Sequence, residues 1–256
     1  MVQSMWTGKA LIRPGWAVFH GTAGDHARHR HHAVQVAIGL RGPIELWAES
    51  PGALLAPGVA IAADCSHQIV SGPDPVLLLY LERESAPGRA LDNWCARSAK
   101  PLSQVQSREL SSLLSNPVEI GPQVIAQVLT AILGSTPTKT HEAFSDERIA
   151  RSLAALPRPL PESVTGATLA KHFGLSSSRY GHLFRAHTGM PLRPYLRWLR
   201  LQQALTEVAR GANLTEAAYA AGFADSAHLS RSFRKTFGIR PSVLLQPALS
   251  LKADTG

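Results

Sequence analysis

Two similar stretches decide the fold of this chain: HLFRAHTG at residues 182–189 and RSFRKTFG at residues 231–238. Phe184 and Phe233 lie 49 positions apart, and the arginines and closing glycines beside them repeat at the same spacing. An internal repeat of this kind indicates a supersecondary unit that is built twice.

Caps and turns around each stretch predict a helix-turn-helix unit. The predicted first cap, turn and second cap are Thr165, Gly174 and Ser176 in one unit, and Thr215, Gly222 and Asp225 in the other. We expect one long helix over residues 192–209 to join the units, and Gly238 followed by Pro241 to end the second. A helix-turn-helix places its second helix in the major groove of DNA, so two units would contact two successive groove faces.

The charge of the chain is concentrated in the same part. Residues 158–256 carry 13 Lys and Arg against 5 Asp and Glu, whereas residues 1–157 carry 13 of each. The C-terminal part therefore holds the whole net charge of +8. A basic region beside a neutral one favours a polyanionic partner for that region, the alternative being a solvated basic face.

The first 83 residues predict a small β-barrel or sandwich. Short apolar runs alternate with Gly- and Pro-rich breaks at even spacing, which is typical of all-β domains. The predicted strands are 17–19, 34–40, 44–47, 59–62 and 76–81.

Helices are expected after Gly88, at residues 91–98, 107–114 and 122–133. The last has one apolar stripe, which is either a dimer face or a surface packed against its own barrel. Residues 134–140 resemble a linker in composition. Ser145 is the expected cap of a further helix, which the proline-rich residues 157–161 end.

The two cysteines and the apolar runs bear on the compartment. Cys65 and Cys95 lack metal-site spacing, and two thiols in a chain of 256 residues fit a reducing compartment. The N-terminus lacks the pattern of a signal peptide, and the longest dense apolar run, Val76–Leu81, is too short to span a membrane. We therefore expect a cytoplasmic protein without a membrane partner.

Residues 145–245 resemble the DNA-binding domain of AraC-type (AraC/XylS family) bacterial transcription regulators. The matching residues fall at fixed spacing, among them Leu169-Ala170, Gly174-Leu175-Ser176, Leu183-Phe184-Arg185, Gly222-Phe223-Ala224-Asp225 and Phe237-Gly238-Ile239-Arg240-Pro241. Ala217 departs from the pattern, which favours a larger aliphatic residue there. The resemblance implies an α+β protein with a cupin-like β-barrel sensor at 1–83, a helical segment and linker at 84–140, and an all-α double helix-turn-helix domain at 141–256.

The resemblance also implies which residues contact DNA. Base-reading positions are Ser178, Gly181 and His182 in the first unit and Ser226, Ala227, His228 and Arg231 in the second. Gly181 has no side chain with which to reach a base, whereas the guanidinium of Arg231 can contact guanine at two points. The predicted phosphate contacts are Arg179, Arg185, Arg234 and Lys235. His182 and His228 are equally compatible with a solvated surface.

A group of histidines in the N-terminal half resembles the cupin-like sensor domain of the same proteins. His29, His31, Gln35 and His67 follow the spacing of metal-binding cupins, with Gln in place of Glu. They are structural, line a small-molecule effector pocket, or hold a metal. Because Gln is a poor neutral ligand, we predict an effector pocket or a structural role, with no metal and no cofactor.

These patterns together predict a sequence-specific transcription regulator that binds promoter DNA. A small-molecule effector, a second copy of the chain and RNA polymerase are the further partners that the resemblance allows. One alternative is a metal-dependent cupin enzyme fused to a DNA-binding domain. Gln35 and the lack of paired carboxylates near the histidines argue against it, so we expect no catalytic residues. Another is an architectural DNA binder without a sensor function.

Overall fold

The computed structural model describes residues 5–24, 27–70, 74–115, 120–134, 146–156, 160 and 164–253. The chain divides into two compact units, one formed by Met1–Lys139 with Ser230–Gly256 and the other by Thr140–Leu229. The C-terminal end of the chain therefore belongs with the N-terminal unit. No helix among the described residues is long and apolar enough to cross a membrane.

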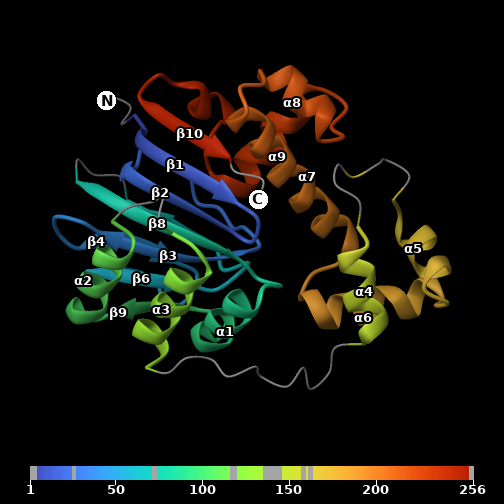
Figure 1. The fold of residues 1–256 in the computed structure, drawn as a ribbon, viewed down its shortest axis with the longest axis horizontal. Coiled ribbons are helices and arrows are strands. Elements are labelled where there is room, and N and C mark those ends of the chain that lie inside the picture. Colours follow the sequence, from blue (N-terminus) through green and yellow to red (C-terminus); the bar gives the residue numbers. More distant parts are fainter. Residues whose placement is uncertain are drawn as a thin grey trace. The chain divides into compact units, whose positions relative to one another are not determined.

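Two β-sheets form the first unit (Figure 1). The seven-stranded sheet has the order β10 (Leu249–Ala253), β1 (Thr7–Arg13), β2 (Trp16–Thr22), β8 (Pro75–Glu82), β3 (Ala33–Gly39), β6 (Gly58–Ile61) and β9 (Ala99–Leu102). The three-stranded sheet has the order β5 (Ala53–Ala56), β4 (Ile44–Ala48) and β7 (His67–Ile69). Both sheets contribute buried side chains to one hydrophobic core.

The central strands are buried, and this burial is why their apolar runs could be recognised in the sequence. On β3 nearly every residue is buried, and Val36 lies opposite Leu79 of β8 on one side and Ala60 of β6 on the other. All five predicted strands are present. The short strands β5, β7 and β9 and the mixed-polarity strand β1 were not predicted, because segments of this kind show no clear apolar alternation.

Three helices complete the N-terminal part of this unit: α1 (Ala86–Cys95), α2 (Gln104–Leu113) and α3 (Pro122–Leu133). Ser85 caps α1 and Ser103 caps α2, so both helices begin earlier than the sequence predicted. The apolar stripe of α3 is buried in the core, through Ile125, Val128, Leu129 and Ile132. The stripe therefore packs within its own unit and is not a free dimer face.

The second unit is helical. It contains α4 (Glu147–Ala154), α5 (Gly166–His172), α6 (Ser177–Thr188), α7 (Leu192–Ala209) and α8 (Leu214–Ala220), and the chain continues into α9 (Ser226–Phe237) and the 3₁₀ helix η2 (Pro241–Leu245). The joining helix α7 has the predicted bounds. The core of the second unit includes the stacked rings of Tyr180 and Phe184. The Tyr180 hydroxyl forms a hydrogen bond of 2.5 Å with the buried hydroxyl of Ser152.

Two predicted caps are displaced. Asp146 caps α4, and the expected cap Ser145 lies outside the described residues. Asn213, not Thr215, caps α8, because its side chain accepts hydrogen bonds from the amides of both Thr215 and Glu216. Glu216 in turn accepts from the amide of Asn213, which completes a capping box. The predicted caps Thr165 and Ser176 are confirmed.

The expectation of an all-α domain at residues 141–256 is wrong for residues 249–253, which form strand β10. This strand pairs in parallel with β1, with Leu11 opposite Lys252, and lies beside it in Figure 1. An edge strand such as β1 exposes backbone donors and acceptors, which a second strand can pair. The terminal segment thereby extends the N-terminal sheet.

Candidate nucleic-acid interface

The turns of the two helix-turn-helix units have the same hydrogen bonds. Gly174 and Gly222 both have left-handed backbones, with φ of 66° and 74°. The amide of Leu175 donates to the carbonyl of Ala170 at 2.8 Å, and Phe223 makes the equivalent bond, 48 positions later, at 2.9 Å. The repeat seen in the sequence is therefore a repeat of backbone geometry.

The second turn is one residue longer than the first. Up to the glycine, equivalent positions differ by 48, whereas the caps of the following helices, Ser176 and Asp225, differ by 49. The Ser176 hydroxyl accepts from the amide of Arg179 at 3.2 Å, and the Asp225 carboxylate accepts from the amide of His228 at 2.5 Å. The extra residue, Ala224, lies between turn and cap, so the two second helices begin differently.

Helix α6 presents the predicted residues on one side. The side chains of Ser178, Arg179, His182 and Arg185 are exposed, while Tyr180, Phe184 and Thr188 are buried. Gly181 is exposed as well, and no described atom lies within 4 Å of the position that its Cβ would occupy. The exposed face thus has two cations and a histidine.

Helix α9 has the same division. The exposed side chains are Ala227, His228, Arg231, Arg234 and Lys235. Ser226 is half-buried, and Leu229 and Phe233 are buried. The His228 ring packs edge-on against Phe223, with ring centroids 5.2 Å apart, which restrains this side chain beside the helix start.

Two exposed arginines on α7 were not among the predicted contacts. Arg193 and Arg197 are one helical turn apart and lie on the same face of the helix. Both arginines fall between the apolar positions of α7, and this pattern in the sequence indicates that they share an exposed face. They add positive charge to the second unit.

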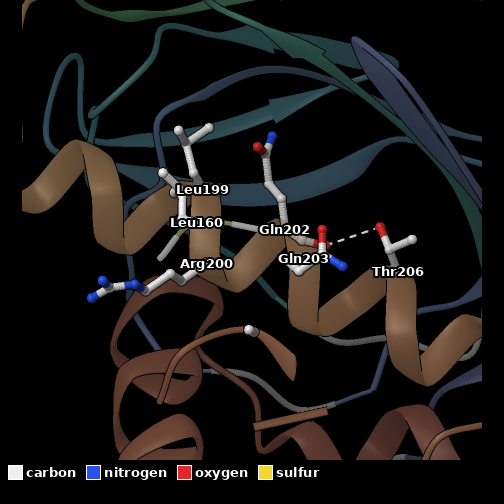
Figure 2. Close-up of a pocket in the computed structure, with 7 residues that line it drawn as sticks. Leu160, Leu199, Arg200, Gln202, Gln203 and Thr206 are labelled. Atoms are coloured by element: carbon white, nitrogen blue, oxygen red, sulfur yellow. Dashed lines mark hydrogen bonds between the residues drawn. The ribbon is translucent and has the colours of Figure 1, made fainter. Parts of the chain in front are cut away.

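A pocket in the second unit is too small for an effector. Figure 2 shows the residues that line it, which come mainly from α7 and include Arg200, Gln203 and Leu199. Its volume of about 40 Å³ has room for only a few water molecules. Two of the lining residues are hydrogen-bonded to each other: the Thr206 hydroxyl donates to the carbonyl of Gln202 at 3.1 Å.

The structure brings together the four residues predicted for the sensor. His29, His31, Gln35 and His67 are at most 8% exposed. His29 and His67 face each other across a β-bridge, and Gln35 Oε1 lies 3.0 Å from Nε2 of both His31 and His67. Burial lowers the pKa of His31.

His32 faces the other way, as strand alternation predicts. Its ring nitrogens lie 2.9 Å from the carboxylate of Asp64 and 2.7 Å from that of Glu84. Burial alone would lower the pKa of His32, but these two carboxylates raise it to about 9. His32 is therefore a buried cation between two anions, separate from the other three rings.

Comparison with known proteins agrees with this architecture. Residues 169–246 match the family model described as "Helix-turn-helix domain". The HTH-type transcriptional activator RhaS of Pectobacterium carotovorum subsp. carotovorum is 37% identical over 90 residues, which cover 35% of this chain and 32% of RhaS. The chain thus spans about a third of the length of this curated relative.

The fold of the whole chain is similar to that of ToxT from Vibrio cholerae. An apo ToxT variant from strain SCE256 has a TM-score of 0.61 at 11% identity, with 90% of this chain and 97% of ToxT covered. Wild-type ToxT bound to an unsaturated fatty acid gives 0.53 at 10% identity, with 93% and 97% covered. The chain thus carries a helix-turn-helix domain at residues 169–246, is similar in sequence to RhaS over part of its length, and has a fold similar to that of ToxT.

Proposed function

We propose that this protein is a sequence-specific, DNA-binding transcription regulator. The observation that carries the proposal is the division of α6 and α9 into a buried apolar face and an exposed face with arginines and histidines. Backbone amides and caps hold each of these helices after a matching turn. This arrangement suits insertion of a helix into the major groove, with cations placed for phosphates.

Within this proposal the residues that face outward on α6 and α9, together with the half-buried Ser226, have two roles. Ser178, His182, Ser226, Ala227, His228 and Arg231 contact base edges. Arg179, Arg185, Arg234 and Lys235 contact phosphates, and Arg193 and Arg197 of α7 add to that group. Base contacts provide sequence preference, whereas phosphate contacts provide affinity and register.

The proposal also assigns a role to each region of the chain, following the resemblance of the sequence to AraC-type regulators. Residues 1–83 are the sensor, 84–140 the helical segment, and 141–256 the DNA-binding region, whose terminal strand β10 pairs with β1 of the sensor. That ToxT is described with a fatty acid bound supports a small-molecule effector here. A second copy of the chain and RNA polymerase are further proposed partners. The proposal includes no catalytic step.

The proposal is tested by selecting DNA sites from a random pool with the full-length chain. We expect one enriched motif, bound with an affinity that falls steeply with salt because Lys and Arg displace counterions. Enrichment of no motif, with equal binding to all sequences, would favour an architectural DNA binder and contradict the proposal.

A further inference from the structure

The three buried histidines share one hydrogen-bonding pattern. Nδ1 of His29 donates to the carbonyl of Ala27 at 3.0 Å. Nδ1 of His31 donates to Ala33 at 3.0 Å and that of His67 to Cys65 at 2.9 Å. A carbonyl can only accept, so each Nδ1 carries a hydrogen and each neutral ring has its lone pair on Nε2.

This tautomer gives Gln35 an unusual environment. Nε2 of His31 and Nε2 of His67 both lie 3.0 Å from Gln35 Oε1. An oxygen facing two lone pairs would be repelled, and two adjacent imidazolium cations in a buried site would repel each other. Two arrangements remove the conflict: the amide turns its NH₂ toward the rings, or a cation lies among the nitrogens and the oxygen.

The rings are spaced as metal ligands are. Their ligand atoms lie within 4.8 Å of one another, and the ring centroids are 4.5, 5.0 and 5.6 Å apart. Three imidazoles on a tetrahedral ion with nitrogen–metal bonds of about 2.0–2.1 Å would have centroids about 5 Å apart. A hydrogen bond from the second ring nitrogen to a carbonyl is also the usual support of a histidine ligand.

We propose that His29, His31 and His67 bind one divalent first-row transition-metal ion through Nε2, with the Gln35 amide oxygen as fourth ligand. Imidazole and amide ligands of this kind suit Zn²⁺ or Co²⁺ rather than Mg²⁺ or Ca²⁺, which prefer carboxylates. In the metal-free protein the Gln35 amide turns and donates its NH₂ to His31 and His67. Metal binding reverses that amide.

The site also holds the end of α9, within the same compact unit. Ala27 accepts from His29 through its carbonyl, and its amide donates to the carbonyl of Gly238 at 2.9 Å. The rings of His31 and Phe237 are 6.4 Å apart. A metal ion that fixes His29 therefore fixes the segment to which the end of α9 is bound.

The test uses the full-length chain without an affinity tag, stripped with a chelator. After incubation with Zn²⁺ and gel filtration, we expect one metal per chain by mass spectrometry, and visible absorption from the Co²⁺ form. His31→Gln and His67→Gln should bind at least about tenfold more weakly, while His172→Gln, which changes an exposed histidine on α5, should bind as the unchanged chain does. Less than about a tenth of a metal per chain, or equal binding by the His31 and His172 variants, would overturn the proposal.

A further variant, Gln35→Glu, distinguishes loss of metal binding from loss of folding, because the proposal predicts that it gains affinity. Gln35→Glu keeps all three histidines and replaces a neutral ligand by a carboxylate, so its metal affinity should rise at least about tenfold; an unchanged affinity would overturn the role of Gln35. Hydrogen exchange of the Ala27 amide should slow when metal binds, and unchanged exchange would contradict the link to α9. These measurements use no DNA, so their failure is distinct from failure of the proposed function.

Discussion

The backbone amide of Ala27 donates a hydrogen bond of 2.9 Å to the carbonyl of Gly238, the glycine at which α9 ends. The two residues are far apart in sequence but belong to one compact unit. The C-terminal part of α9, a helix predicted to contact bases, therefore belongs to the β-sheet unit that contains His29, His31 and His67. This contact binds the C-terminal end of α9 to the region that we propose as the sensor.

Gly238→Ala should destabilise the N-terminal unit by about 2–4 kcal/mol. The left-handed backbone of Gly238, with φ of 73°, costs a side chain about 1–2 kcal/mol. The added Cβ would also lie 2.3 Å from the carbonyl oxygen of Ala27 and 2.8 Å from His29 Nδ1. The control is Gly15→Ala in the same unit, at φ of 86°, where no described atom lies within 4 Å of the new Cβ. Denaturant unfolding that shows equal losses in the two variants would contradict the close packing.

Tyr180→Phe should cost about 1–3 kcal/mol of stability, because it leaves the hydroxyl of Ser152 buried without its partner. Adding Ser152→Ala should recover part of that loss, since neither hydroxyl is then present. A double-mutant cycle by denaturant unfolding measures the coupling. Strictly additive losses would show that this contact does not join α4 to α6.

Arg231→Ala should reduce sequence preference, and Arg234→Ala should weaken binding to all DNA about equally. One two-point contact to guanine is worth about 1–3 kcal/mol of discrimination, whereas a phosphate contact carries none. Both arginines are exposed on α9, so each serves as the control for the other. Affinities for the selected site and a scrambled site give the ratio. An unchanged ratio in Arg231→Ala would remove its base-reading role.

Local signals in the sequence predicted the helical unit well. The caps Thr165 and Ser176 and the turn glycines act through neighbouring amides, so their effect is visible in a short window. The cap of α8 was placed two residues late, because the choice between Asn213 and Thr215 depends on Glu216 completing the capping box. The extra residue Ala224 could have been found by comparing the spacing on each side of the turn.

Long-range contacts were the part that the sequence could not supply. Strand β10 has only five residues, and its structure depends on the free edge of β1 at the other end of the chain. Strand alternation accounts for the side chains of His31 and Gln35 lying on one face and that of His32 on the other. The tautomers of the histidines, by contrast, follow from carbonyl positions such as that of Cys65, which no spacing rule contains.

The central claim, that both helix-turn-helix units contact bases, is tested most directly by base-pair substitution across the footprinted site of the full-length chain. The account predicts two sensitive patches about ten base pairs apart, one helical turn of DNA. The patch under α9 should be the more sensitive, because α9 presents His228 and Arg231 whereas α6 presents His182 as its single long base-reading side chain. Equal sensitivity would contradict the asymmetry, and a single patch or none would contradict the claim that both units contact bases.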